Sequence, residues 1–372
     1  RQEEKTRLYL FYEKLPALMS WSLLATPLIL SLVSARATVF FILAYLLLWF
    51  LRAIALNFRV LQGWGTMKLH QGLDWGKLLD DLQNRRVSVK RPKWHKTNIE
   101  RLEKYPAPVK PSEVIHAVII ATYNESRDTL EPTIQSVLSS MYDMKKVILV
   151  LAYEERGGKD TERQAKELVR DYGDDFMFAE AIKHPVNIPG EVVGKGGNIT
   201  YAAKKLVRLL KKEKIDPARV IVTTLDSDNR PHPNYLPALT YTYCLCPNPE
   251  HISFQPIPMF TNNIWDAPAP MRVIATGNSF WMVVQSLRQH MLRNFSAHAQ
   301  PMDALIDTDF WSVRTIVEDG HQFWRSYFRF DGRHEVYPIF VPIYQDAVLA
   351  RGYIRTLKAQ FVQLRRWAWG AS

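Results

Sequence analysis

The sequence predicts an α/β fold, a Rossmann-like sheet with flanking helices, preceded by a helical hairpin long enough to cross a membrane. Three observations predict it. Strand-length apolar runs alternate with helical patterns from residue 114 onward, polar side chains follow the ends of those runs, and residues 15–57 hold two long apolar stretches. Near-continuous apolar strands that alternate with helices are typical of mostly parallel sheets.

The apolar stretches at 15–34 and 37–57 predict two membrane spans joined by a short link. The first has no charged residue, and the only charge in the second, Arg52, lies near one end, where its side chain can reach the interface. Each stretch has the length of one helical span. A signal peptide fits poorly because a second apolar stretch follows at once. A buried hairpin in a soluble protein is the alternative.

Lysine and arginine gather on both outer flanks of this hairpin, which predicts that the flanks and the rest of the chain are cytoplasmic. They are Arg1, Lys5, Arg7 and Lys14 before the first span, and Arg59, Lys68, Lys77, Arg85 and Arg86 after the second. We therefore expect a multi-pass protein of the plasma membrane with a cytoplasmic catalytic domain. The first residue is not Met and the chain stops after a basic segment, so we expect missing ends, with further membrane spans after residue 372.

The composition is basic and rich in tryptophan. The 372 residues carry a formal charge of +11 and include 11 tryptophans. Membrane flanks and an anionic substrate explain this charge, and no arginine-rich tail or zinc-finger spacing points to nucleic acid. The cysteines, Cys244 and Cys246, lack the second ligand pair of a metal site, which predicts two buried thiols in a reducing compartment.

The periodicity predicts the elements of the α/β region in order. Strands are expected at 114–121, 145–152, 176–181 and 219–225. The helices between them are expected to contain Leu130, Ile134, Val137 and Leu138 on one face with Asp128 as N-cap, then 160–172, then 196–212. Upstream, 72–85 suits an interfacial helix, and 90–96 and 106–111 predict a linker.

Two aspartates, Asp226 and Asp228, follow the strand at 219–225, where ligands of parallel sheets bind. At positions i and i+2 of an extended chain they point to one side. Oxygen ligands suit Mg²⁺ or Mn²⁺, which also take substrate phosphates. An Asx-turn pair that caps the next segment is the alternative.

The stretch PGEVVGKGGN, 189–198, places Lys195 in a glycine-rich turn that opens a helix, which predicts an anion site. It is not a Walker A loop, because Pro189 and Gly196 stand where that motif needs Gly and Ser or Thr. A plain flexible loop is the alternative.

Two further motifs follow. Glu318 and Asp319 precede an aromatic-rich segment, although adjacent acids also suit the start of a helix. Gln363, Arg366 and Trp367 stand at i, i+3 and i+4 and so share one helix face. Arginine offers a fork for phosphate oxygens and tryptophan a flat surface for a sugar. A basic helix that contacts lipid headgroups is the alternative.

In order, the stretches VIIATYNE, GKGGN, LDSD, VED and QLRRW resemble the signature series of the family 2 membrane glycosyltransferases, which includes the cellulose, chitin and hyaluronan synthases. The resemblance covers about residues 115–370. An ED motif followed by QxxRW is typical of the polymer-making branch. FQPIP (254–258) and ATGNSF (275–280) resemble the family's VQTP stretch and its glycine-containing acceptor loop.

This resemblance implies a GT-A fold, an inverting transfer of a sugar, and a role for each matching residue. The residues implied in donor binding are Thr122, Asn124, Glu125, Glu154, Glu155, Lys195, Asn198 and Asp226. Asp228, with Asp226, would hold Mg²⁺ or Mn²⁺. Asp319, beside Glu318, would be the general base, and an ordinary aspartate pKa of about 3.9 would suffice for it. The residues implied at the acceptor and diphosphate are Gly277, Asn278, Gln363, Arg366 and Trp367.

Two departures from the family pattern stand out. The second strand runs into AYEERGG where the family has DDG, so Glu154 or Glu155 would replace the aspartate that helps to hold the base. This leaves the base open, although a UDP-sugar remains the expected donor. Val317 replaces the common threonine of TED, while both acids remain.

The implied function is a membrane-embedded transferase that moves a sugar from a nucleotide sugar to a hydroxyl of a growing polysaccharide or glycan. A non-processive transferase with a lipid acceptor, such as polyprenyl phosphate, is the alternative, and a membrane-anchored binding protein without activity is a third. The expected domains are a membrane hairpin (1–60), an interfacial linker (61–110), the GT-A domain (111–347) and a basic helix that carries QxxRW (348–372).

Overall fold

The computed structural model describes residues 6–87 and 90–370, and the chain divides into two compact units, Arg1–Leu61 and Gln62–Ser372. The first unit contains α1 (Arg7–Val33) and the larger part of α2 (Ala35–Gln71). Both helices are long and apolar enough to cross a membrane, and their most apolar windows are not buried. The predicted pair of long apolar helices is confirmed, and each helix extends beyond the predicted stretch.

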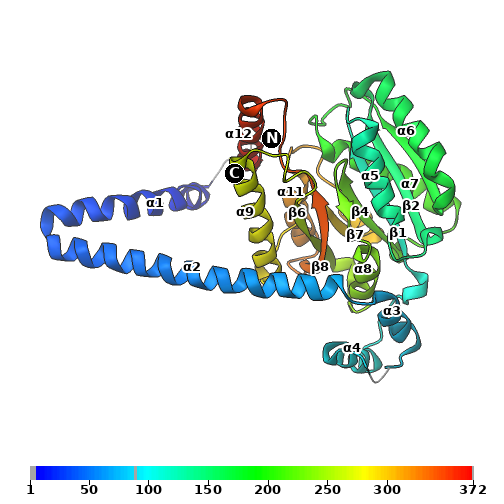
Figure 1. Cartoon of the computed structure of the whole chain (residues 1–372), viewed down its shortest axis with the longest axis horizontal. Coiled ribbons are helices and arrows are strands. Elements are labelled where there is room, and N and C mark those ends of the chain that lie inside the picture. Colours follow the sequence, from blue (N-terminus) through cyan, green and yellow to red (C-terminus); the bar gives the residue numbers. More distant parts are fainter. Residues whose placement is uncertain (1–5, 88–89, 371–372) are drawn as a thin grey trace. The chain divides into compact units, whose positions relative to one another are not determined.

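The second unit contains a mixed sheet of eight strands in the order β3-β2-β1-β4-β7-β6-β8-β5 (Figure 1). Four strands run parallel: β1 (Ile115–Thr122), β2 (Val147–Glu154), β3 (Phe178–His184) and β4 (Val220–Asp226). The others are β5 (Arg230–Pro231), β6 (Ile252–Phe260), β7 (His298–Pro301) and β8 (Glu335–Gln345). Since β7 pairs antiparallel with β4 and β6, the sheet is mixed, as expected of the GT-A-like fold.

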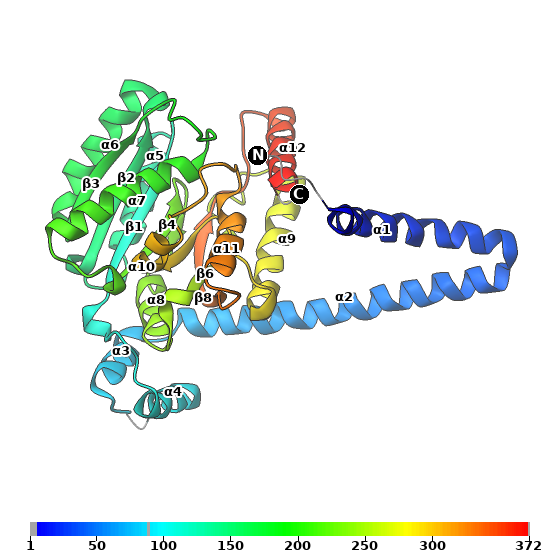
Figure 2. The ribbon, with the colours of Figure 1, turned by 180° about the vertical axis from the view of Figure 1, so that it is seen from behind.

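Helices cover both faces of this sheet (Figure 2). Alternate side chains of each strand therefore enter opposite layers. Val118 and Ile120 of β1 enter one layer, and Ala117 and Ile119 enter the other. The first layer contains α3 (Trp75–Asn84), α4 (Lys93–Lys104), α5 (Arg127–Leu138), α6 (Gly158–Tyr172) and α8 (Tyr235–Tyr243). The second contains α7 (Lys195–Lys212) and α10 (Met302–Asp307).

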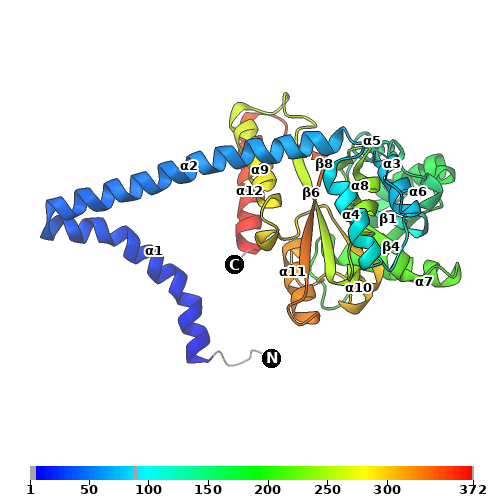
Figure 3. The ribbon, with the colours of Figure 1, turned by 90° about the horizontal axis from the view of Figure 1, so that it is seen from below.

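Three further helices border the later strands: α9 (Ala269–Ser286), α11 (Glu318–Arg329) and α12 (Tyr353–Gly370). Helices α9 and α12 lie side by side, where Met271 and Ala275 pack with Leu357 (Figure 3). Both expose large apolar side chains to solvent, among them Val273, Trp281, Ile354, Phe361 and Val362.

The structure corrects three local predictions. The predicted linker at 90–96 is largely the first turn of α4, which forms because His95, Ile99 and Leu102 bury one face of it. Ser126 rather than Asp128 is the N-cap of α5, and Asp128 lies in its first turn. The predicted acceptor loop, 275–280, is the middle of α9. Cys244 and Cys246 are buried and free, as predicted.

Candidate functional site

The candidate site lies at the carboxyl ends of β1 and β4. Strand order reverses there, since β2 and β3 lie on one side of β1 and β4 on the other, and such switch points hold the ligands of open α/β sheets. Asp226 ends β4, and the register pairs it with Ala121, next to the end of β1.

Lys195 and Ser296 hold the carboxylate of Asp226 from two sides. Lys195, the first residue of α7, places Nζ 2.7 Å from Oδ1 of Asp226 and donates to the carbonyl of Ser296 at 3.1 Å. The Ser296 hydroxyl donates to the other carboxylate oxygen of Asp226. Burial alone would raise the pKa of Asp226, but Lys195, Ser296 and the charge of Arg366 hold it below its ordinary value.

Glu318 and Asp319 open α11 and face the same lysine. Asp319 accepts from the N–H of Gly320 at 2.7 Å, and the backbone of Ser296 lies close enough to act on its carboxylate. Burial raises the pKa of Glu318 to about 7 and raises the pKa of Asp319 as well. The expectation of an ordinary pKa for Asp319 is therefore wrong for the ligand-free protein. Ser296 thus bonds to both Lys195 and Asp226 and lies close to Asp319.

Asp228 lies two residues beyond β4 and contacts Asp346, a residue that the sequence patterns did not single out. Oδ1 of Asp228 accepts from Asn229 at 3.0 Å, and Oδ2 accepts from the backbone N–H of Asp346 at 3.0 Å. Burial and the charge of Asp226 raise the pKa of Asp228 to about 7. One carboxylate oxygen of Asp346, Oδ1, is buried and has no hydrogen-bond partner among the described residues.

These carboxylates fit a dication that arrives with phosphates. Within residues 6–87 and 90–370, no three His, Cys, Asp or Glu side chains form a ready ligand set. The buried, unpaired oxygen of Asp346 beside Asp228 leaves acceptor capacity for a cation. Mg²⁺ and Mn²⁺ suit oxygen donors, and Mg²⁺ commonly binds through one or two carboxylates with substrate phosphates as further ligands. Asp228 and Asp346 fit that pattern better than Asp226, which Lys195 neutralises.

Two glycines of the 189–198 turn, Gly196 and Gly197, serve packing. A Cβ at Gly196 would lie 2.4 Å from the Ser312 carbonyl, and one at Gly197 would lie 2.8 Å from the Glu191 carboxylate. Because Gly196 and Gly197 have no side chain, the start of α7 can approach these neighbours. Lys195 thereby reaches the acidic residues. Neither glycine is exposed as a phosphate cradle would be.

The polar residues after β1 mostly bond to the backbone of their own turn. Glu125 accepts from the Thr122 hydroxyl at 2.7 Å and from the N–H groups of Tyr123 and Asn124 at 2.7 and 3.2 Å. Asn198 is buried and donates to the carbonyls of Ala152 and Thr122, at 2.8 and 3.4 Å. Glu125 and Asn198 therefore fix the strand ends, while Asn124 is exposed.

The two residues that could hold the nucleotide base, Glu154 and Glu155, differ in exposure and in partners. Glu154 is only 7% exposed and pairs with Arg156. Glu155 is exposed and accepts from the N–H of Val186 at 3.1 Å.

The proposed acceptor residues lie on the paired helices α9 and α12. Gly277 is exposed and Asn278 half-buried in the middle of α9. On α12, Gln363 accepts from Gln360 at 3.2 Å, and Trp367 is half-buried. Arg366 is close enough for its charge to act on Asp226, so α12 borders the acidic site.

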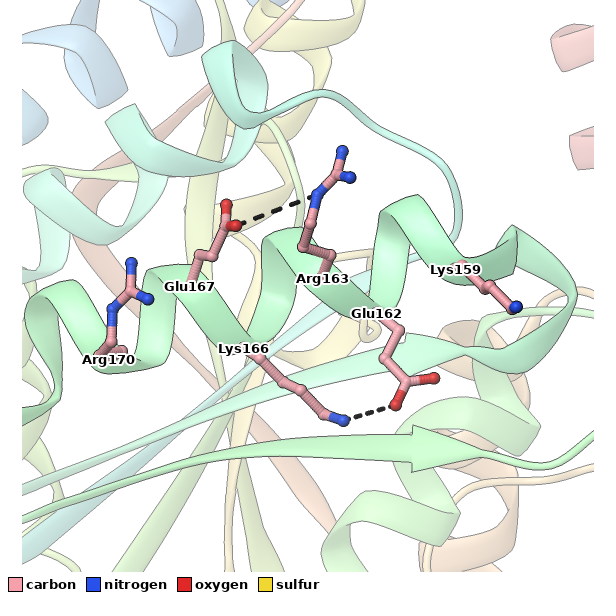
Figure 4. A pocket seen from close by; sticks show the side chains of 6 residues that line it. All are labelled: Lys159, Glu162, Arg163, Lys166, Glu167 and Arg170. Carbon is pink, nitrogen blue, oxygen red and sulfur yellow. Dashed lines mark hydrogen bonds and ion pairs between the residues drawn. The ribbon is translucent and has the colours of Figure 1, made fainter.

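A shallow depression on α6 has a different character (Figure 4). Its lining is Lys159, Glu162, Arg163, Lys166, Glu167 and Arg170. These charged side chains largely pair along the helix, with Lys166 2.6 Å from Glu162 and Arg163 3.9 Å from Glu167. Solvent-exposed ion pairs of this kind on a helix surface attract each other only weakly. The acidic site at the ends of β1 and β4 therefore remains the candidate functional site.

No protein-family model and no curated protein matches the sequence. Among solved structures, the chain is similar to the mannosyltransferase PcManGT from Pyrobaculum calidifontis in complex with GDP-Man and Mn²⁺, at 15% identity and a TM-score of 0.44, over 80% of this chain and 70% of that one. It is also similar to S. aureus TarS, at 14% identity and a TM-score of 0.40, over 63% of this chain and 37% of TarS. The chain is similar as well to GalNAc-T7 with UDP, GalNAc and Mn²⁺, at 12% identity and a TM-score of 0.42, over 64% of this chain and 45% of that one. The chain thus spans less than half of the last two.

Proposed function

We propose that the chain is an inverting, metal-dependent glycosyltransferase that moves a sugar from a nucleotide-sugar donor to a hydroxyl of a growing polysaccharide or glycan. The observation that carries this proposal is the convergence of Lys195, Asp226 and Asp319 on Ser296. The lysine at the start of α7 and the aspartates of β4 and α11 thereby share one buried site at a strand end. This is where a GT-A enzyme of the resembled family would bind its donor.

Each group has a distinct part in the proposed reaction. Lys195 binds the diphosphate and Asp226 contacts the nucleoside. Asp319 takes the proton of the acceptor hydroxyl as that oxygen attacks the anomeric carbon, and the bond from that carbon to the diphosphate breaks. Because Asp319 must be ionised to act, its raised pKa has to fall when the donor and the dication bind. Mg²⁺ or Mn²⁺, held by Asp228 with Asp226 or Asp346, would offset the charge on the leaving diphosphate.

The helix α12 supplies the proposed acceptor side. Arg366 already acts electrostatically on Asp226, so a fork for phosphate oxygens lies at the border of the acidic site. Gln363 and Trp367 would contact the acceptor sugar from the same helix, and Gly277 and Asn278 from α9.

We also propose that α1 and α2 form a membrane hairpin and that residues 111–347 form a cytoplasmic GT-A domain at the plasma membrane. The exposed apolar side chains of both helices support the hairpin. The linker at 61–110 and the basic helix at 348–372 would then lie at the lipid boundary.

A lipid-linked acceptor is the second candidate. The exposed apolar side chains of α9 and α12, among them Trp281 and Phe361, favour it, since they flank the proposed acceptor residues. The product separates the two candidates: a size ladder means polymerisation, and a single glycolipid band means one transfer.

The test is a screen of nucleotide sugars with the full chain in native membranes or detergent, with Mg²⁺ or Mn²⁺. Sugar transfer or donor hydrolysis that is lost in Asp319→Asn would support the proposal. A well-folded chain that neither binds nor turns over any nucleotide sugar would refute it.

A further inference from the structure

We propose that Asn262 and Asn263 are positioning residues that hold Asp228 and Asp346 in place as ligands of a dication. This inference rests on the proposed function, because it concerns the metal of the same site. Both asparagines lie in the segment between β6 and α9, and both are half-buried. Neither belongs to a motif that the sequence patterns singled out.

The parallel strands β6 and β8 end side by side. The register pairs Phe260, the last residue of β6, with Gln345, the last residue of β8. The chain that leaves β6 therefore passes along the chain that leaves β8. The backbone N–H of Asn262 donates to the carbonyl of Gln345 at 3.1 Å. This bond fixes the residue that directly precedes Asp346.

Asn263 holds the residue that directly follows Asp346. Its side-chain nitrogen Nδ2 donates to the carbonyl of Ala347 at 2.9 Å, and its Oδ1 accepts from the N–H of Ala347 at 2.7 Å. Ala347 is buried in a cluster with Met271 of α9. Because both neighbours of Asp346 are bonded in this way, the backbone that carries its carboxylate has little freedom.

Asn262 also bonds to the second acid. Its Nδ2 donates to the main-chain carbonyl of Asp228 at 2.9 Å. The N–H of Asp346 donates to Oδ2 of Asp228 at 3.0 Å, so the segments after β4 and β8 are joined through two contacts. Neighbouring carboxylates repel each other until a cation lies between them. The asparagine bonds oppose that repulsion in the ligand-free protein.

The asparagine amides leave the carboxylates available to a metal. Both amides donate to main-chain carbonyls and not to carboxylate oxygens. A carboxylate has about four lone-pair sites, of which Asp228 uses two, for Asn229 and for the N–H of Asp346. Oδ1 of Asp346 has no hydrogen-bond partner among the described residues. A neutral amide therefore orients the two acids without competing for the cation, as a lysine or arginine would.

The experiment measures how Mn²⁺ tightens nucleotide binding to the detergent-purified full chain. The probe is whichever of UDP, GDP, ADP and CDP binds most tightly, and calorimetry gives its Kd in EDTA and at increasing Mn²⁺. In Asn262→Ala and in Asn263→Ala, the Mn²⁺ concentration that gives half of the tightening should rise by about tenfold, as is usual when a residue that orients a metal ligand is lost. The Kd in EDTA should not change, because Lys195 still binds the diphosphate. A general loss of structure would weaken binding in both conditions.

Asn234→Ala is the matched control. Asn234 is also half-buried and donates to two main-chain carbonyls, those of Gln71 and Leu73, at 2.9 and 3.1 Å. Its loss removes similar bonds that involve neither acid. This variant should lower the thermal midpoint and keep the Mn²⁺ requirement of the unmodified chain.

Thermal midpoints accompany each variant. If Asn263→Ala does not fold, Asn262→Ala, which loses one side-chain hydrogen bond instead of two, gives the second reading. An unchanged Mn²⁺ requirement in the folded variants, or an equal rise in Asn234→Ala, would overturn the inference alone. Nucleotide binding that Mn²⁺ does not tighten in the unmodified chain would overturn it together with the proposed metal. Absence of binding by all four nucleotides would overturn the proposed function as well.

Discussion

The backbone N–H of Asp346 donates a 3.0 Å hydrogen bond to the carboxylate of Asp228. This contact joins the residue after β8 to the segment after β4, and it brings two acidic residues together although they are 118 positions apart along the chain. The side chain of Asp346 keeps an unpaired, buried oxygen beside Asp228. We propose this pair as the site at which a dication binds.

Asp346→Asn should raise the Mn²⁺ concentration needed for half-maximal transfer by about tenfold or more, because it removes a charged oxygen ligand and keeps the backbone N–H. The measurement is a metal titration of sugar transfer. Asp266→Asn, at an exposed aspartate of the loop before α9, is the control. A titration curve identical to that of the unmodified protein would exclude Asp346 from the metal site.

Removal of divalent metal should stop the reaction. EDTA is expected to lower transfer to background, and Mg²⁺ or Mn²⁺ in excess should restore it, since the charge on a leaving diphosphate needs a counter-ion. Transfer that continues at full rate in EDTA would remove the metal role of Asp228.

Asp319→Asn should abolish transfer and leave nucleotide binding nearly intact. Loss of a general base costs about 10²–10⁴-fold in rate, whereas the amide has nearly the shape of the carboxylate. Single-turnover transfer and nucleotide Kd are the two measurements. Asp331→Asn, at an aspartate whose side chain is 87% exposed, should change neither. Activity equal to that of the unmodified protein would refute the base assignment.

Glu318→Gln should change how stability depends on pH. The pKa of Glu318 rises from 4.5 to about 7 in the folded chain. The folded state then holds a proton that the unfolded state has lost, so the stabilisation is complete below pH 4.5 and is lost as the pH rises through 7. The glutamine of Glu318→Gln does not ionise, so the variant keeps its stability over this pH range. The free energy of unfolding of the variant should therefore rise relative to that of the unmodified protein as the pH increases from 5 to 8.

Thermal unfolding of the detergent-purified chain at several pH values measures this difference. Glu335→Gln, at an exposed glutamate, should run parallel to the unmodified protein. A Glu318→Gln curve that also runs parallel would show that Glu318 titrates with an ordinary pKa.

Gly196→Ala should destabilise the second unit. The added methyl group would lie 2.4 Å from a backbone carbonyl and 3.0 Å from the Cβ of Glu318, and such overpacking costs about 1–3 kcal/mol. We expect a lower thermal midpoint and weaker activity, since Lys195 and Glu318 flank the contact. Gly65→Ala, at a helical glycine with open space around it, should not lower the midpoint.

The first half of the sheet could be predicted from the sequence because its signals are local. Strands β1, β2 and β4 are near-continuous apolar runs, and Asp226 is the last residue of β4, with Asp228 two positions later. The later strands were not predicted individually, since proline interrupts β6 and β8. Helix α4 was missed although His95, Ile99 and Leu102 recur at helical spacing.

Parts of the site depend on contacts that no local pattern encodes. Ser296 lies in a loop before β7, 70 positions from Asp226, and has no neighbouring motif. Asp346 directly follows β8, much as Asp226 ends β4, but it stands without a second acid nearby in sequence. The raised pKa of Asp319 arises from burial by other segments, so the residue type alone could not predict it.

The ion pair between Lys195 and Asp226 has a consequence for how nucleotide and metal bind. In the ligand-free protein the ammonium group satisfies the aspartate, so a diphosphate that recruits the lysine leaves an acid in need of a new partner. A dication meets that need. Nucleotide and metal should therefore bind as a thermodynamically linked couple, each tightening the affinity for the other by the same factor.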